Sequence, residues 1–379
     1  MALFDEPVEI VPARRRRRAP RGMVGGMWAL VLALAALLAM TFLPTSFVIQ
    51  QPGPVYDTLG ETAGPDGETT PLISVEGAET FPTAGSLDLL TVQIVGNRER
   101  TPSWFELALA WFDPARAVMP LEAVFPAGQT TEQRDEESAA MMVDSQKEAT
   151  AAALQKLDYD VNSHIEVYDV LEDAAAAGVL EPGDTVVEAD GEKVASADEL
   201  REAINELDGQ PVPITIERDG TRRDVTVTPK QAEADGEKVW IIGVTLTTDF
   251  DFPIDVTIQL DNVGGPSAGM MFALGIIDTL TPGELNGGED IAGTGTITAD
   301  GVVGAIGGIR QKLYGAKNAG ADFFLSPRTN CNEVQGHVPD GLRVFAVDDL
   351  DDALAAVQAI ADGGDLDALP TCTAADLDP

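Results

Sequence analysis

The alternation of apolar and polar positions changes period several times along the chain, and each change marks a predicted element. Residues 23–49 form a stretch of 27 positions without a charged side chain. Crossing a bilayer takes roughly 20 apolar residues, so this stretch is long enough. A cleaved signal peptide has an apolar stretch of only about 7–15 residues that ends at small side chains. The pattern therefore predicts an uncleaved transmembrane helix, with a cleaved signal peptide as the better alternative and a buried core helix as the weaker one.

Shorter periodic segments follow this stretch. Residues 50–86 are rich in Gly, Pro, Thr and acidic side chains, which predicts a connector with one short strand at most. Leu87–Val95 alternates like a strand. In Pro102–Asp113, apolar and aromatic side chains recur at helical spacing, which favours a core helix over one on a membrane surface. Glu132–Leu157 predicts a long helix with these inner positions: Ala139, Met142, Ala149, Ala153 and Leu157.

Residues 161–229 predict a small β-rich module with these elements: a strand over Ile165–Leu171, a helix over Ala197–Leu207, and strands over Val212–Arg218 and Arg223–Val227. Asp219-Gly220 between the last two strands is a strong hairpin signal. The segments Ala176-Ala-Gly-Val-Leu-Glu-Pro-Gly-Asp184 and Val187-Glu-Ala-Asp-Gly-Glu-Lys-Val194 resemble a PDZ domain in the circular order of bacterial membrane proteases. This resemblance implies capture of extended peptide ends by strand addition. A structural module without a ligand is the alternative.

A serine lies in a Gly/Pro-rich turn between a predicted strand, Asp255–Leu260, and a helix, Met270–Leu280, that is apolar on nearly every side. Ser267 in this turn has two interpretations. It is a helix cap, since serine accepts a backbone N–H there, or it is a nucleophile. For the second role, nearby glycines allow a substrate to approach closely, and backbone N–H groups around Gly265–Ser267 hold an oxyanion.

A serine nucleophile needs a base, and the candidate is a lysine. Residues 294–308 predict a hairpin and a glycine turn that lead into a helix over 309–317. Lys312 lies at the edge of the apolar face of this helix, which consists of Ile309, Leu313 and Ala316. The remaining side chains point elsewhere: Arg310, Gln311, Tyr314 and Asn318. Burial lowers the pKa of a lysine, as a base requires, although a snorkelling lysine that covers apolar surface fits the position equally well.

Gly-Pro-Ser-Ala-Gly followed by Gly-Gly-Ile-Arg-Gln-Lys resembles the proteolytic domain of Lon-type serine proteases, which use a Ser-Lys dyad. The resemblance implies that Ser267 is the nucleophile and Lys312 the general base, without a metal or organic cofactor. Gly265 and Pro266 belong to the serine motif. Thr294-Gly295 matches a pair in the family, which implies that Thr294 hydrogen-bonds the lysine.

The chain departs from Lon at two places and lacks one Lon component. Gly264 stands where Lon usually has an acid, and the Ser-to-Lys spacing is lengthened near Asn286–Glu289. No P-loop motif is present, so ATP-driven unfolding of substrates is not expected. The whole outline resembles the PDZ-containing Lon-like membrane peptidases of bacteria. Because Lon-type domains often form rings, a homo-oligomer is expected by analogy alone.

Charge refines this outline. The 379 residues include 24 Lys+Arg and 63 Asp+Glu, a formal net charge of −39, which argues against nucleic acid as a partner. Six arginines precede the predicted span: Arg14 to Arg18 and Arg21. By the positive-inside rule the N-terminus is expected in the cytoplasm and the rest outside. An oxidising exterior permits a disulfide between Cys331 and Cys372, with two unpaired thiols as the alternative.

Two other functions compete with the protease. Gly265-x-Ser267-x-Gly269 also fits the nucleophile elbow of an α/β-hydrolase-like esterase, with His337 as base and Asp322 as acid. His337 lies in a turn-rich segment, and a metal site is not expected because His164 is the only other histidine. The second competitor is a membrane-anchored PDZ scaffold whose dyad is inactive. It would bind peptides without cleaving them.

The predicted fold class is α/β (α+β), with a transmembrane helix, a PDZ-like module and a Lon-type domain of mixed sheet and helices. The predicted function is an ATP-independent, membrane-anchored serine endopeptidase acting on extracytoplasmic proteins or peptides. The predicted segments are a basic tail (1–22), the anchor (23–49), a connector with the first part of the protease (50–157), the PDZ-like domain (158–232), the Lon-type domain (236–362) and an acidic tail (363–379).

Overall fold

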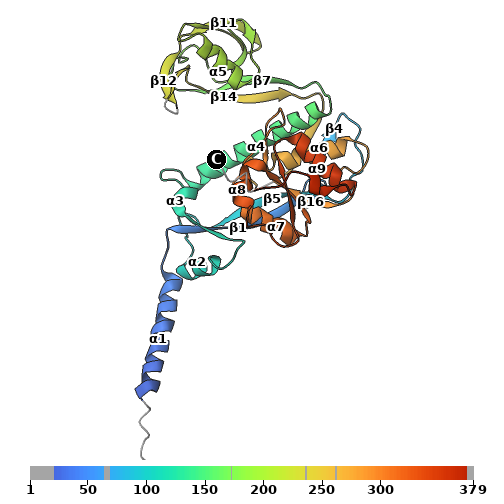
Figure 1. Ribbon diagram of the computed structural model, residues 1–379. Coiled ribbons are helices and arrows are strands. Elements are labelled where there is room, and N and C mark those ends of the chain that lie inside the picture. The colour runs from blue at the N-terminus through green and yellow to red at the C-terminus, as the bar shows by residue number, and fades with distance from the viewer. Residues whose placement is uncertain (1–20, 64–68, 172, 235–236, 261–262, 374–379) are drawn as a thin grey trace, which may run out of the picture.

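The computed structural model describes residues 21–63, 69–171, 173–234, 237–260 and 263–373. Nearly all of the predicted basic tail and the last residues of the acidic tail lie outside these ranges. Figure 1 shows three parts: the helix α1, a mixed α/β part and a β-rich module. The α/β part comprises residues 47–156 and 255–373, so the module is inserted into it.

The first helix, α1, spans Arg21–Phe42. It ends earlier than predicted, because Phe47–Asp57 forms strand β1 and so takes the last three positions of the predicted 23–49 span. In the part of the chain that the structure describes, no helix combines the length and the apolar character needed to cross a bilayer. The predicted anchor therefore gains no support from the fold.

The main sheet of the α/β part has the strand order β20-β19-β16-β5-β1-β6. Strands β5, β16, β19 and β20 run parallel, whereas β1 is antiparallel to both β5 and β6. The predicted strand at 87–95 is confirmed, and the early strands join the late ones in one sheet. The bounds of its other members are β5 Ser86–Val95, β6 Ala117–Pro120, β16 Asp290–Gly293, β19 Phe323–Pro327 and β20 Arg343–Val347.

The prediction of a loop-rich connector over 50–86 is wrong, because most of this segment forms strands. Pro52 and Pro54 suggested a loop, yet both lie in β1. The pairing of β1 with β5 shifts register between Pro52 and Val55, and a bulge of this kind accommodates proline in a strand. Three short strands follow: β2 Glu61–Ala63, β3 Thr69–Pro71 and β4 Ile73–Glu76.

Helices cover both faces of the main sheet. On one face Leu87 and Leu89 of β5 pack in a core with three helices: α4 Thr131–Lys156, α6 Gly269–Leu280 and α9 Leu350–Ala361. Leu90 faces the other side, against α7 Ile309–Ala319. As predicted, α6 is buried along almost its whole length. Strand β15, Asp255–Ile258, leads toward α6 and pairs with β4.

Most of the predicted inner positions of the long helix are buried in α4. Met142, Ala149 and Ala153 are buried as predicted, and Leu157 is half-buried just beyond the helix. Ala139 is exposed, so that prediction is wrong. The buried face of α4 begins only at Met142, where the helix starts to pack against the core that contains α6.

The β-rich module, residues 162–251, has a sheet of order β11-β10-β8-β7-β14. The hairpin predicted at Asp219-Gly220 is confirmed, and both turn residues have positive φ. Strand β14 pairs with β7, so the module extends to Asp251, well beyond its predicted end. Its elements are β7 Asn162–Val170, β8 Thr185–Ala189, β9 Glu192–Lys193, α5 Ala197–Glu206, β10 Val212–Arg218, β11 Thr221–Val227, β12 Lys230–Ala234, β13 Glu237–Ile241 and β14 Val244–Asp251.

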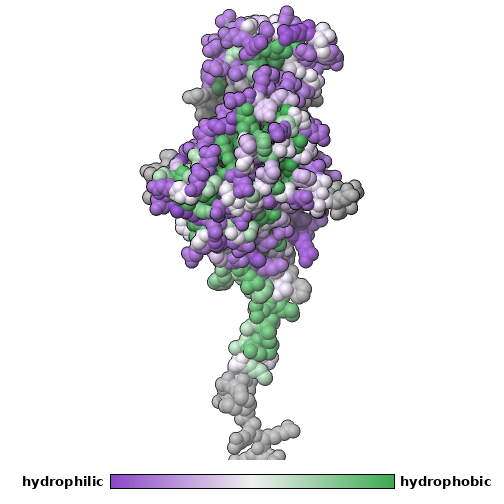
Figure 2. All heavy atoms as spheres, turned by 90° about the vertical axis from the view of Figure 1, so that its right-hand side faces the viewer, coloured by the Kyte–Doolittle hydropathy of each residue, from purple (hydrophilic) through white to green (hydrophobic). Residues whose placement is uncertain are grey.

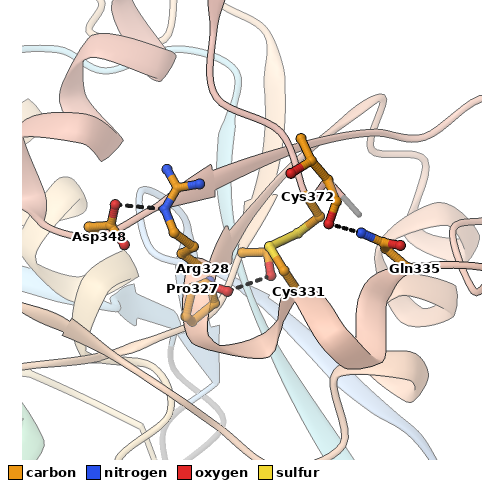
Figure 3. Close-up of a disulfide and its surroundings, with 8 residues drawn as sticks. Pro327, Arg328, Cys331, Gln335, Asp348 and Cys372 are labelled. Carbon is orange, nitrogen blue, oxygen red and sulfur yellow. Dashed lines mark hydrogen bonds and ion pairs between the residues drawn. A yellow bond between two sulfur atoms is a disulfide. The ribbon is translucent and has the colours of Figure 1, made fainter. Parts of the chain in front are cut away.

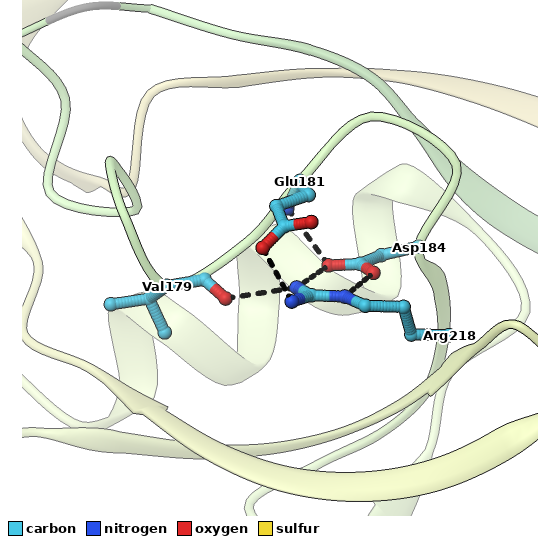
Figure 4. Close-up of polar contacts among 4 residues, drawn as sticks. All are labelled: Val179, Glu181, Asp184 and Arg218. Carbon is cyan, nitrogen blue, oxygen red and sulfur yellow. Dashed lines mark hydrogen bonds and ion pairs between the residues drawn. The ribbon is translucent and has the colours of Figure 1, made fainter.

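One ion-pair cluster fixes the turn before β8 (Figure 4). The guanidinium of Arg218 donates to both carboxylate oxygens of the buried Asp184, to Glu181 and to the carbonyl of Val179. Burial is the largest single influence on the pKa of Asp184 and raises it, but the hydrogen bonds from Arg218 and from the N–H of Glu181, together with the charges of Arg218 and Arg223, lower the pKa overall. The carboxylate therefore stays ionised inside the module.

Helix α2, Trp104–Ala110, corrects the core-helix prediction for residues 102–113. Leu107 and Ala110 are buried against β1, whereas the large side chains of Trp111 and Phe112 beyond its end are exposed. The remaining short elements are α3 Leu121–Val124, β17 Thr296–Ile297, β18 Val303–Gly304, α8 Cys331–Val334 and two 3-10 helices, η1 Arg328–Asn330 and η2 Leu366–Ala368. Strands β17 and β18 pair as the predicted hairpin.

The C-terminal tail is tied to the α/β part by a disulfide between Cys331 and Cys372 (Figure 3). Cys331 begins α8. The tail also contacts the end strand of the sheet, because the N–H of Ala346 in β20 donates to the carbonyl of Pro370. The side chain of Gln335 donates to the carbonyl of Thr373 beside the disulfide. These contacts place the tail along β20.

Candidate active site

Residues 263–268, the serine loop, connect β15 to α6 and lie against α4. Gly265 has φ +86°, a conformation that glycine adopts readily. Its N–H donates to the carbonyl of Ser138 on α4 at 2.8 Å. A Cβ on Gly264 would lie only 2.7 Å from the Cβ of Ser138. A side chain at position 264 would therefore force α4 or the loop to shift.

Hydrogen bonds hold the serine loop from both sides. Ser145 of α4 donates to the carbonyl of Pro266 at 3.0 Å. On the other side, the hydroxyl of Thr294 (2.8 Å) and the N–H of Gly295 (3.0 Å) donate to the carbonyl of Ser267. Neither Ser138 nor Ser145, the two α4 residues that bond the serine loop, was identified from the sequence. A weak signal existed for Ser145, since it lies on the inner face of α4 between Met142 and Ala149.

Lys312 extends to Ser267 from α7, which covers the face of the main sheet opposite to α6. Ile309, Leu313 and Ala316 anchor α7 in the core, and Lys312 is only 1% exposed. Its Nζ lies 2.7 Å from Ser267 Oγ and 2.8 Å from Thr294 Oγ1. Of the two interpretations of Lys312, burial is therefore confirmed and the snorkelling position is not. The prediction that Gln311 points away is wrong, because Gln311 is buried.

The surroundings of Lys312 change its protonation. Burial lowers the pKa of Lys312 from 10.5 to about 7, because the charged ammonium loses its hydration. Its two side-chain hydrogen-bond partners, Ser267 and Thr294, are uncharged hydroxyls. A large fraction is therefore neutral near pH 7, and the amine lone pair is available to accept the proton of Ser267.

The predicted oxyanion donors around Gly265–Ser267 need a correction. The N–H of Gly265 is already donated to α4, and Pro266 has no N–H. In the described part of the chain, the N–H groups of Ser267 and Ala268 have no protein acceptor. These two groups lie at the start of α6, where free N–H groups and the helix dipole favour negative charge.

A cleft of about 630 Å³ opens at Ser267. The cleft is lined by strands β1 and β5, helix α4 and the serine loop. Lys312 lies behind Ser267 and does not line the cleft. Arg134 stands over the ring of Phe125 at 4.8 Å on one side of the cleft. The serine hydroxyl is therefore open to a substrate, while its lysine partner is shielded from water.

The hydrolase triad is not assembled. His337 lies in the turn after α8, with Arg310 and Glu333 as charged neighbours, and it does not line the cleft. Asp322 pairs with Lys317. The lengthened segment near Asn286–Glu289 is also remote from the serine, since the buried Asn286 bonds the carbonyls of Ser86 and Glu289 at the start of β5 and β16.

Two family models match separate parts of the chain. Residues 255–359 match the Lon protease (S16) C-terminal proteolytic domain. The C-terminal region is thus similar to a Lon-type proteolytic domain. Residues 139–228 match the PDZ domain model. That match begins within α4, which packs on the Lon-type domain, and ends before β14, which completes the sheet of the module.

Curated relatives include Lon proteases and one zinc metalloprotease. Lon protease 2 of Herpetosiphon aurantiacus is 38% identical over 109 residues, which are 27% of this chain and 13% of that protein. The Lon protease of Campylobacter concisus is 39% identical over 94 residues, covering 24% and 11%. The zinc metalloprotease RasP of Geobacillus kaustophilus is 40% identical over 73 residues, covering 19% and 17%. The chain thus spans about one eighth of the length of these Lon proteases.

Similar solved structures include two PDZ domains. That of an SdrC-like protein from Listeria monocytogenes is 28% identical and covers 22% of this chain and 85% of its own, with a TM-score of 0.20. That of an SdrC-like protein from Listeria innocua is 26% identical and covers 22% and 92%, also with a TM-score of 0.20.

Proposed function

We propose that the chain is an ATP-independent serine endopeptidase with Ser267 as nucleophile and Lys312 as general base. The observation that carries the proposal is the 2.7 Å contact between Lys312 Nζ and Ser267 Oγ inside a Lon-type domain. A lysine that is 1% exposed and has a pKa of about 7 is suited to remove a proton from serine.

The proposed reaction is acyl transfer. Neutral Lys312 takes the proton of Ser267 as its Oγ attacks the peptide carbonyl carbon, and the N–H groups of Ser267 and Ala268 bind the resulting oxyanion. The ammonium of Lys312 then gives its proton to the leaving amine, which departs as the C–N bond breaks. Water attacks the acyl-enzyme with Lys312 again as base, and Ser267 regains its proton. Thr294 keeps the lysine amine directed at the serine.

The substrates in this proposal are extended polypeptides. Strand β5 pairs with β16 only up to Leu89, and in the described part of the chain no strand covers that edge of β5 beyond this point. The cleft runs along these uncovered residues to Ser267. A peptide that adds a strand there would present its carbonyl to the serine. The PDZ-like module would capture or position a substrate end.

Membrane attachment and an extracytoplasmic catalytic part belong to the same proposal. Their support is the charge-free stretch over 23–49 and the six arginines before it. Membrane attachment requires that α1 be embedded in lipid, and an extracytoplasmic catalytic part requires in addition that the stretch over 23–49 cross the bilayer. The homo-oligomer stays a prediction by analogy with ring-forming Lon domains.

The test is cleavage of an unfolded protein by the full chain purified in detergent. Ser267→Ala and Lys312→Met should each abolish cleavage, and Thr294→Val should lower it. His337→Ala is the matched control and should keep full activity. Activity that survives Lys312→Met but not His337→Ala would overturn the dyad. Peptide binding without cleavage by the wild type would favour a binding scaffold instead.

A further inference from the structure

Helix α2 carries its large side chains on the outside. Its inner side chains, Leu107 and Ala110, are fully buried against β1. The outer side and the turn that follows present Leu109, Trp111 and Phe112, which are 54%, 65% and 89% exposed, together with the partly exposed Trp104 and Phe105. Contiguous exposed apolar surface of this kind marks an interaction site.

What covers this aromatic face is indicated by its neighbour, α1. The exposed apolar side chains of α1 occur at most positions from Met27 to Met40, and Figure 2 shows this helix as an apolar rod that extends below a largely polar body. Successive residues of a helix are about 100° apart, so these side chains surround the axis of α1. A partner protein in a groove would cover one side of such a helix, whereas a lipid phase covers all sides.

The end of α1 and the start of α2 are joined, so they share one environment. Pro44 forms a β-bridge with Ser103, and the hydroxyl of Thr45 donates to the carbonyl of Pro102 at 2.8 Å. Ser103 is also the N-cap of α2, with a capping box to Glu106 that fixes the start of the helix. Figure 1 shows α2 beside the end of α1, where the chain enters the α/β part.

We infer that the aromatic face of α2 docks on the lipid surface in which α1 is embedded, as a second membrane contact. The inference rests on the proposed membrane attachment. Trp and Phe side chains are suited to the boundary between headgroups and acyl chains. The contact has a consequence for catalysis. Because α2 packs on β1, and β1 lines the cleft at Ser267, the docked helix would hold the cleft at a fixed height and angle above the membrane.

The experiment uses the full chain reconstituted in phosphatidylcholine–phosphatidylglycerol vesicles, with tryptophan fluorescence as the readout. Trp28→Phe removes the tryptophan of α1, which leaves Trp104, Trp111 and the distant Trp240. In vesicles with bromine near the top of the acyl chains, emission from α2 should be quenched, and bromine deep in the chains should quench less. Adding Trp111→Phe should remove most of the quenching.

A disruptive variant and a matched control complete the test. Phe112→Glu should reduce the quenching toward the value without bromine. Val338→Glu changes an exposed apolar side chain in the loop after α8 and should not reduce it. Vesicle flotation is measured on the same samples. Protein that floats without any quenching of α2 overturns the docking but keeps attachment, and protein that does not float overturns attachment itself. If Trp111 is shielded from water without lipid, and this shielding grows with protein concentration, the face would be assigned to a second copy of the chain.

Discussion

Replacing Lys312 by methionine should abolish activity and yet stabilise the fold at neutral pH. The pKa of Lys312 falls from 10.5 to about 7 on folding, and each unit corresponds to about 1.4 kcal/mol. Between these two values the unfolded chain binds a proton that the folded chain does not. Wild-type stability therefore rises with pH from about 7 to 10.5, and the full cost of burying the amine, about 5 kcal/mol, is reached only below pH 7.

The magnitude at each pH follows from this linkage. At pH 7 the lysine costs the folded state about 4 kcal/mol, and at pH 10 about 1 kcal/mol. Methionine removes this cost but also loses the bonds to Ser267 and Thr294, at about 1 kcal/mol each. Lys312→Met should thus be about 2 kcal/mol more stable than wild type at pH 7, and slightly less stable at pH 10.

The assay is calorimetric unfolding of the full chain in detergent at pH 7 and pH 10, following the transition of the Lon-type domain. Lys317→Met is the control, because Lys317 lies on the same helix, is partly exposed and pairs with Asp322. It should show no change of sign between the two pH values. A stability difference for Lys312→Met that is the same at both pH values would refute the reasoning, since the lysine would then be charged in the folded state.

Further expectations concern pH, the serine loop and the PDZ-like module. The rate at which a fluorophosphonate phosphonylates Ser267, with loss of fluoride, should rise with pH through a midpoint near 7, because the neutral amine is the active form; a flat profile from pH 5 to 9 would contradict this. Ser145→Ala should lower kcat about tenfold, equivalent to about 1.4 kcal/mol, with KM little changed, and Ser145→Thr should restore it. Equal losses in both variants would mean that packing matters and the hydrogen bond does not. Arg218→Met should destabilise the module by about 3–5 kcal/mol, because Asp184 is left buried without its partner, and chemical unfolding of that variant checks it.

The serine and lysine motifs were recognisable from sequence because their local patterns are strong. Each motif can be recognised from residues that are adjacent in sequence. One is Gly-Pro-Ser-Ala-Gly between a strand and an apolar helix, and the other is a lysine among Ile309, Leu313 and Ala316. Burial of Lys312 was left open, since helix position alone does not show what packs over it. The inner-face position of Ser145 was a weak signal, but the contacts of Ser138 and Ser145 could not be predicted, because each joins the serine loop to a helix about 120 residues upstream.

The errors in the fold have the same origin. Pro52 and Pro54 carry loop signals, and only the bulge against β5 shows that a strand tolerates them. Strand β14 follows a segment that looks like a domain boundary, and only its pairing with β7 assigns it to the PDZ-like module. For α2, the spacing of apolar side chains gave the helix but not which face is covered. The structure shows that its smaller side chains point inward and its aromatics outward.

The main sheet, in which early and late strands meet where β5 pairs with β16, also sets an order in time for a chain made from its N-terminus. Ser86 of β5 bonds Asp290 of β16 across 204 positions, and at about 5–20 residues per second a ribosome needs roughly 10–40 s to synthesise that interval. During this time β5 has only β1 as a neighbour, while the PDZ-like module has its whole sequence and can fold first. The serine and the lysine meet only after β16 and α7 have been synthesised. A nascent chain therefore has no assembled Ser267–Lys312 pair until most of the molecule has been made.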